Sequence, residues 1–203
     1  MSDNPLIILI GLVATAYFFK LWLGDLKMER RGTPNPNAFP GATPASKTAI
    51  ILGILGALII LAGETVGEYA FGFVEEQSDM TVLFGLFTLA AAFVEELIFR
   101  GFLVVTKKGR AALIGSIFLF SILFALFHPF LWEWQDDGLV FNFSGKAWFS
   151  TSIVFINSLW FYTIRFLPVN PRHSLLPCIA AHFASNLGVI LIKLFQGHIV
   201  GLY

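Results

Sequence analysis

Two adjacent carboxylates in an apolar stretch are the first candidates for chemistry in this chain. The stretch from Ala92 to Arg100 contains Glu95 and Glu96 among apolar residues and ends on the arginine. Residues four positions apart share a helix face, so Glu96 can pair with Arg100, while Glu95, rotated by about 100°, is expected to face elsewhere. A charge at the centre of a bilayer costs about 2.5–3.5 kcal/mol, so two carboxylates placed there indicate a functional site.

Two further segments bring histidines into apolar surroundings. The segment from Phe124 to His128 ends on one histidine, and His182 is followed four positions later by Asn186. The last two side chains can therefore present two hydrogen-bond donors in one direction from a single helix face.

Each of these groups taken alone also has a purely structural interpretation. Glu96 and Arg100 can form a buried ion pair that fixes helix packing, and His128, or His182 with Asn186, can supply hydrogen bonds between helices. Taken together, on three helices and with one spare carboxylate, they favour a functional site.

The composition indicates which kind of chain must position these groups. Of the 203 residues, 57% are hydrophobic and 13% are charged, where globular proteins have about 45–50% and about 25%. Such a composition excludes a disordered chain, and the lone Cys178 excludes a disulfide-stapled fold. Nucleic-acid binding lacks its electrostatic basis, because 13 basic residues face 13 acidic ones. A polytopic membrane protein remains.

The spacing of apolar runs predicts an all-α fold of about six transmembrane helices, with a four-helix catalytic core. A bilayer requires about 20 apolar residues per helix. The predicted division is into residues 1–79, with two N-terminal spans, and residues 80–203, with the catalytic core. The six expected spans are residues 5–23, 48–63 with a further extension open, 80–106, 111–132, 147–167 and 175–195.

Basic residues predict the orientation of these spans. Eleven flank the first, third and fifth connections, and only Lys146 and Lys193 fall on the other side. By the positive-inside rule both termini lie outside and the odd-numbered connections lie in the cytoplasm. The eleven are Lys20, Lys27, Arg30, Arg31, Lys47, Arg100, Lys107, Lys108, Arg110, Arg165 and Arg172.

The three segments resemble the motifs of the CPBP intramembrane proteases, also called the CAAX-protease or Abi family, which includes the type II CAAX prenyl endopeptidases. The matching patterns are Glu-Glu-x-x-x-Arg at 95–100, Phe-x-x-x-His at 124–128 and His-x-x-x-Asn at 182–186. The resemblance covers roughly residues 80–195, so the first two spans lie outside it. It implies a glutamic intramembrane endopeptidase.

The resemblance also implies a role for each site residue. Glu95 would be the general base that activates a water together with His128, and His182 and Asn186 would form an oxyanion hole. Glu96, Arg100 and Phe124 would support this geometry. The chemistry is compatible, since a carboxylate in a medium of low dielectric is suited to take a proton from water. Preorganised donors at a developing oxyanion are worth about 3–4 kcal/mol.

The sequence offers two other chemistries. Glu95, His128 and His182 could supply the two-histidine, one-carboxylate set of a catalytic zinc site. Against zinc, Asn186 is a poor ligand and the sequence has no His-Glu-x-x-His pattern, so no cofactor is expected and zinc is the alternative. A thiol nucleophile at Cys178 is disfavoured, because cysteine is commonly a small buried residue.

The expected partners are the lipid bilayer and a membrane protein or lipidated peptide as substrate, without nucleic acid. The expected location is a bacterial inner membrane. His182 lies about seven residues from the cytoplasmic start of its span, which predicts a site in the cytoplasmic half, provided that residues 100–116 project past the hydrocarbon. Glu64 and Glu68 are interpreted as a pair in a loop or at a helix end. The alternative is a role on a substrate pathway.

Two rival functions remain open. One is a catalytically silent family member that acts as an interaction or immunity protein. The other is a proton-coupled carrier in which Glu95 and His128 titrate. A carrier would need polar residues that continue to both faces, whereas the outer halves of the spans are apolar.

Overall fold

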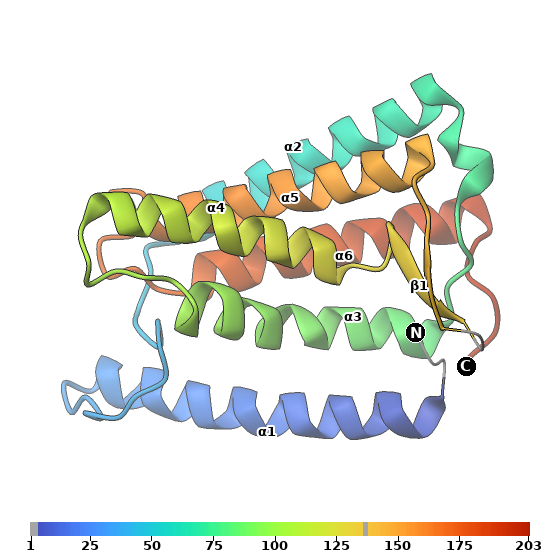
Figure 1. The fold of residues 1–203 in the computed structure, drawn as a ribbon. Helices are drawn as coiled ribbons and strands as arrows, with labels where there is room; N and C mark the ends of the chain where they lie inside the picture. Colours follow the sequence, from blue (N-terminus) through green and yellow to red (C-terminus); the bar gives the residue numbers. More distant parts are fainter. Residues whose placement is uncertain (1–3, 136–137) are drawn as a thin grey trace.

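The computed structural model describes residues 4–135 and 138–203 as a bundle of long helices with one small hairpin (Figure 1). The long helices are α1 (Pro5–Arg30), α2 (Lys47–Phe71), α3 (Val82–Glu95), α4 (Arg110–Phe127), α5 (Gly145–Phe166) and α6 (Leu176–Gln196). The short elements are the 3-10 helix η1 (Phe73–Glu76), the π-helix η2 (Glu96–Phe102), and the antiparallel strands β1 (Trp132–Gln135) and β2 (Gly138–Phe141). The predicted all-α membrane fold is confirmed.

Polar residues fix where several of these helices begin. Asn4, Ser46, Thr81 and Ser144 precede α1, α2, α3 and α5, and each side chain accepts a hydrogen bond from a backbone N–H of the first turn. These bonds satisfy donors that a helix start otherwise leaves unpaired. At the other end of α2, Gly72 adopts the left-handed conformation that closes a helix.

Helices α5 and α6 form the centre of the bundle. Helix α6 packs against α2, α3 and α5, while α5 packs against α2, α4 and α6. Helix α1 lies at the edge and packs mainly against α3 (Figure 1). The predicted division between residues 79 and 80 stays a prediction, although α2 packs against α5 and α6 in one bundle.

The structure corrects the predicted bounds of several spans. The first two helices extend to Arg30 and Phe71, beyond the expected ends at residues 23 and 63. The fourth ends at Phe127 instead of residue 132, and the hairpin of β1 and β2 follows. The cause is Pro129, which restricts the preceding residue to extended backbone, and His128 has ψ 123°. His128 therefore stands at the end of α4 and not inside a span.

Among the residues that the structure describes, five helices are long and apolar enough to cross a membrane, namely α1, α2, α3 with η2, α4 and α6. Helix α5 is not among them, because it carries polar residues such as Thr151, Asn157 and Ser158. These three side chains are buried against neighbouring helices. With 22 residues, or about 33 Å, α5 is still long enough to span the hydrocarbon.

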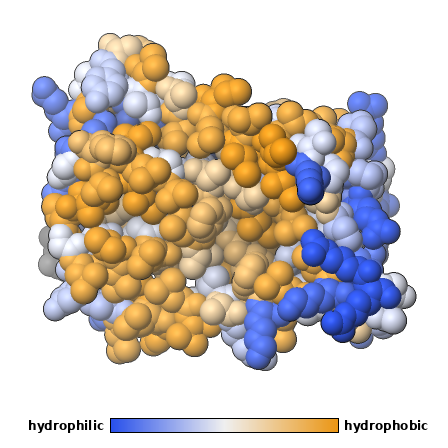
Figure 2. Space-filling view, turned by 180° about the vertical axis from the view of Figure 1, so that it is seen from behind, coloured by the Kyte–Doolittle hydropathy of each residue, from blue (hydrophilic) through white to orange (hydrophobic). Residues whose placement is uncertain are grey.

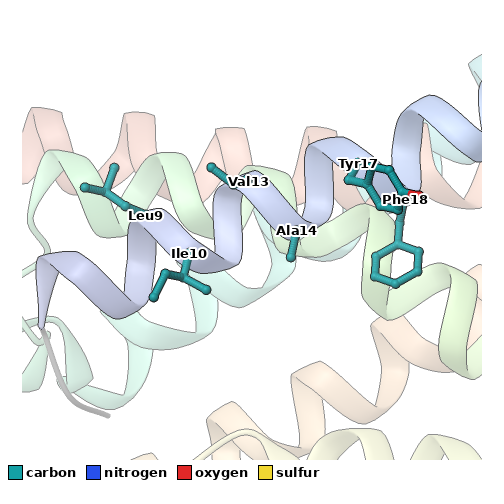
Figure 3. A pocket seen from close by; sticks show the side chains of 6 residues that line it. All are labelled: Leu9, Ile10, Val13, Ala14, Tyr17 and Phe18. Atoms are coloured by element: carbon teal, nitrogen blue, oxygen red, sulfur yellow. The ribbon is translucent and has the colours of Figure 1, made fainter.

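The outer surface of the bundle is apolar in a broad band (Figure 2). Many large apolar side chains are exposed there, which a soluble monomer avoids. Figure 3 shows an example, a hollow of about 550 Å³ on the outer face of α1, lined only by Leu9, Ile10, Val13, Ala14, Tyr17 and Phe18. This surface faces lipid, and the chain is an integral membrane protein.

The start of α1 and the C-terminal residues lie at the same end of the bundle (Figure 1). The connections 31–46, 103–109 and 167–175 gather at the other end, where Figure 2 shows a concentration of hydrophilic residues on the right. Of the eleven basic residues assigned to that end, Arg100 and Arg165 are buried inside the bundle. The other nine are exposed. Lys20 lies ten residues before the end of α1, and eight lie at or near that end of the bundle, so the asymmetry that sets the orientation persists.

Close packing of α2 against α5 depends on glycine. A Cβ atom at Gly56 would overlap the indole ring of Trp160, whose Nε1 donates a hydrogen bond of 2.9 Å to the carbonyl of Gly53. At Gly63, on the same helix, an added Cβ would meet nothing within 4 Å.

We therefore expect Gly56→Ala to lower the free energy of unfolding by about 1–3 kcal/mol, the usual cost of overpacking. Gly63→Ala is the matched control and should raise stability by about 0.5–1 kcal/mol, since alanine favours helix over glycine. Thermal unfolding of both variants in detergent measures the difference, and equal midpoints would refute this account of the α2–α5 contact.

Candidate active site

His182 of α6 lies between the two adjacent carboxylates. Its Nδ1 is 2.9 Å from Oε1 of Glu96, and its Nε2 is 3.6 Å from Oε2 of Glu95. Glu96 is fully buried, whereas the side chain of Glu95 is 32% exposed. The sequence predicted that the two carboxylates face apart. They do differ in exposure, yet they approach opposite nitrogens of one imidazole ring.

The π-helix η2 carries Glu96 and Arg100 into the interior. It begins directly after Glu95 and ends where the N–H of Leu103 bonds to the carbonyl of Ile98, five residues earlier. Such widened turns are rare and occur frequently at functional sites. Within η2, Glu96 and Arg100 are both buried, while Ile98 faces outward.

Arg100 is the charge that balances Glu96. Its Nη1 lies 3.2 Å from Oε1 of Glu96, and its Nη2 donates a hydrogen bond of 2.6 Å to Oγ of Ser158 on α5. Ser158 in turn donates to Oγ of Ser121 on α4 at 3.0 Å. Neither the arginine nor the glutamate side chain is exposed, so the pair is fully desolvated.

Aromatic rings surround the guanidinium group of Arg100. Its central carbon lies 4.2 Å from the ring centroid of Phe124, 4.9 Å from that of Tyr162 and 5.2 Å from that of Phe161. A desolvated cation over an aromatic face gains about 2 kcal/mol. The rings therefore stabilise a charge that water cannot reach.

Phe124 links Arg100 to both histidines. Its ring centroid is 4.8 Å from that of His128 and 5.9 Å from that of His182, in addition to the contact with the guanidinium group. Phe161 stacks on the other side of His182, with centroids 5.0 Å apart. Two phenylalanines thus fix the plane of the His182 imidazole.

His128 is held by its own helix end. Its Nδ1 lies 2.8 Å from the carbonyl oxygen of Phe124, which can only accept, so Nδ1 carries the proton and Nε2 is left with a lone pair. The side chain is half-buried and lies within electrostatic range of Glu95, His182 and Arg100. A free imidazole lone pair near a carboxylate is suited to accept a proton.

Asn186 is anchored one turn beyond His182 on α6. Its Nδ2 donates a hydrogen bond of 2.9 Å to the backbone carbonyl of Thr88 on α3. One amide N–H of the same group remains for another acceptor. Nδ1 of His182 and one amide N–H of Asn186 already bond to protein acceptors. These two groups are therefore not available as the donors that the sequence predicted.

Three residues at this site were missed by the sequence analysis, namely Ser121, Ser158 and Tyr162. The hydroxyl of Tyr162 donates to the carbonyl of Phe99 in η2 at 2.6 Å, and Ser158 holds Arg100. The signal that could have found two of them is the spacing of four between Ser158 and Tyr162, which puts two polar groups on one face of α5.

The zinc alternative finds mixed support in the geometry. His128 and His182 both present Nε2 and donate Nδ1–H to an acceptor, as metal-binding histidines commonly do. In residues 4–135 and 138–203, however, no three His, Cys, Asp or Glu side chains are grouped as ligands. As they lie, Glu95, His128 and His182 do not fit a three-ligand metal site.

The other sequence candidates lie apart from this cluster. Cys178 is fully buried, and its thiol donates to the carbonyl of Phe161. Helix α2 continues past Gly63, so Glu64 and Glu68 share a helix face. Glu68 pairs with Lys146 at the start of α5, at the end of the bundle that carries the chain termini.

Comparison with protein-family models matches residues 77–188 to the family described as type II CAAX prenyl endopeptidase Rce1-like. These 112 residues are more than half of the chain and contain the whole cluster from Glu95 to Asn186. Searches of the curated proteins and of the solved structures found no match.

The ion pair at the centre of the cluster leads to a stability prediction. We expect Arg100→Ala to lower the free energy of unfolding by about 3–5 kcal/mol, because it leaves the Glu96 carboxylate buried without a countercharge. The matched control is Arg172→Ala, which removes the ion pair with Glu29, whose two side chains are 57% and 27% exposed.

The control substitution should lower the free energy of unfolding by less than about 1 kcal/mol, because exposed ion pairs contribute no more than that. Thermal unfolding in detergent compares the two variants. If Arg172→Ala were as damaging as Arg100→Ala, burial would not be what makes the Glu96–Arg100 pair important.

Proposed function

The chain belongs to the Rce1-like family of type II CAAX prenyl endopeptidases, and we propose that it hydrolyses a peptide bond in a membrane-associated protein or peptide. The observation that carries this proposal is the placement of His182 between a buried carboxylate and a partly exposed one. Glu96 holds the ring, and Glu95 is left free to meet substrate and water.

Water activation is assigned to Glu95 and His128. A water between them donates one hydrogen bond to the Glu95 carboxylate and one to Nε2 of His128, the nitrogen left without a proton. As the water oxygen attacks the peptide carbonyl carbon, Glu95 takes its proton as general base. Glu95 suits this role better than Glu96, since the latter is committed to Arg100 and His182.

Oxyanion stabilisation is assigned to His182 and Asn186. The ionised Glu96 accepts the proton on Nδ1 of His182, so Nε2 becomes a donor only when the ring is an imidazolium ion. Its Nε2–H and the second amide N–H of Asn186 then face the developing negative charge.

Breakdown of the tetrahedral intermediate completes the reaction. The carbonyl bond re-forms, the carbon–nitrogen bond breaks, and the protonated Glu95 gives its proton to the leaving amine. The carboxylate is thereby restored, and the products are a carboxylic acid and an amine. No metal enters this sequence. The zinc alternative predicts instead that cleavage stops when a chelator is added.

The main prediction concerns the two groups that activate water. We expect Glu95→Gln to abolish cleavage, and His128→Gln to slow it by about 10²–10⁴-fold, the usual contribution of a general base. Glu75→Gln, an exposed carboxylate of η1, is the matched control and should leave cleavage unchanged.

Membrane peptides from cells that carry each variant provide the measurement, with a chelator added in parallel. A precursor that accumulates only with Glu95→Gln supports a protease. Unchanged peptides with a lost ion flux would support the carrier, and a fully retained phenotype would support the interaction protein. Cleavage that stops with chelator and returns with zinc would support the metal mechanism.

We also propose that water reaches the site from the cytoplasmic side of the membrane. His182 lies six residues after the start of α6, or about 9 Å along its axis, at the end where the surface basic residues gather. In Figure 1 the connection 103–109 and the start of α4 extend beyond the neighbouring helix ends, as this arrangement requires. A bacterial inner membrane stays a prediction.

Cysteine labelling tests this side. With Cys178→Ala as background, a cysteine in place of Glu95, whose side chain is 32% exposed at the site, should react with an impermeant thiol reagent only in inverted vesicles. A cysteine at Lys107 is the control for the same face. Labelling at position 95 in intact cells alone would overturn the proposed access.

A further inference from the structure

An apolar groove lies on the side of α6 that faces away from His182. Its volume is about 360 Å³, and it has walls from α1 and α2 and a floor from α6. The lining residues are Phe19, Leu23, Ile50, Ile54, Leu176, Ile179, Ala180, Phe183, Ala184 and Leu187. Because α1 packs mainly against α3, the groove separates α1 from α2 among the described residues.

The length of the groove matches one leaflet of a bilayer. Its floor runs from Leu176 to Leu187, eleven residues or about 16 Å of helix. Half of the hydrocarbon thickness is about 15 Å. The floor begins at the first residue of α6, at the end of the bundle with the connections 31–46 and 167–175. An extended acyl chain of the leaflet on that side would therefore fill it.

Basic residues stand where the headgroup of such a lipid would lie. On α1, Lys27 and Arg30 follow Leu23 by four and seven residues and so continue the groove-facing stripe. On α2, Lys47 precedes Ile50 by three residues and Ile54 by seven, on the same stripe.

All three basic side chains are exposed. In the described residues none of them takes part in an ion pair, whereas the nearby Glu29 is paired with Arg172. The hydrophilic end in Figure 2 contrasts with the apolar band beside it.

From the length of the groove and the basic residues at its end, we propose that it binds one anionic phospholipid. An acyl chain lies between α1 and α2, and the phosphate lies at Lys27, Arg30 and Lys47. The lipid fills the gap that separates the edge helix from the bundle. It also supports α6 from behind the face that carries His182. This inference does not depend on the proposed reaction.

The charge part of the proposal is tested with purified protein in detergent. The probes are phosphatidylglycerol and phosphatidylcholine with identical acyl chains, and the measurements are the unfolding midpoint and the lipids retained in native mass spectrometry. Phosphatidylglycerol should raise the midpoint and be retained one per chain. Each basic residue near a headgroup is worth about fivefold in affinity, so Lys27→Gln with Arg30→Gln and Lys47→Gln should weaken binding by about a hundredfold.

The matched control replaces three exposed basic residues of the same end that do not border the groove, Lys107, Lys108 and Arg110, by glutamine. It should leave binding of phosphatidylglycerol unchanged. Equal losses in both triple variants would indicate unspecific attraction to a basic surface, and equal binding of the two lipids would show that headgroup charge does not select the lipid. Either result would overturn the proposal.

The groove part is tested by filling it. Ala180→Phe with Ala184→Phe should remove the retained lipid, while Ala111→Phe, at an exposed position of α4, should not. Lipid retained in the filled variant would overturn the assigned place. A change of oligomeric state on filling, without loss of lipid, would instead make a second copy of the chain the occupant.

Discussion

The buried ion pair between Glu96 and Arg100 is the constraint around which the candidate site is arranged. Two charges removed from water are tolerated only when geometry and hydrogen bonds compensate for the lost hydration. Here the compensation comes from four directions, through Ser158 of α5, His182 of α6, Phe124 of α4 and the ring of Tyr162. The pair therefore ties η2 to three other helices, and the position of His182 follows from it.

The charges buried within the bundle are confined to a few groups of mutually bonded side chains, because lipid offers them no partners. The site forms one group, and the pair of Glu68 with Lys146 forms another at the opposite end of the bundle. Helix α5 contributes to both, through Ser158 and Lys146. Its polar content, which sets it apart from the five apolar spans, thus reflects its place between charged groups and not exposure to water.

Local patterns in the sequence indicated the carboxylates and histidines of the candidate site, but not the side chains that hold them. The spacing of Glu96 and Arg100 predicted their ion pair, and apolar run lengths predicted the helices, because both depend on residues close in the chain. The contact of Glu95 and Glu96 with one imidazole was not predicted. Glu96 and His182 are 86 positions apart in the chain, and the sequence pattern did not indicate the π-helix that places Glu96. The end of α4 at His128 was predictable from Pro129 and was missed.

The widened turn of η2 makes the number of residues, and not only their identity, a requirement of the site. An α-helix closes the corresponding turn with one residue fewer than the π-helix. Loss of a single residue between Glu96 and Phe102 would give a more regular helix and would turn everything beyond it by about 100°. A residue lost before Arg100 would leave it near Glu96, since residues three apart also share a helix face, but would move its guanidinium group away from Ser158 and the ring of Phe124. At this position less regular backbone hydrogen bonds allow two glutamates that are adjacent in the chain to contact the same histidine.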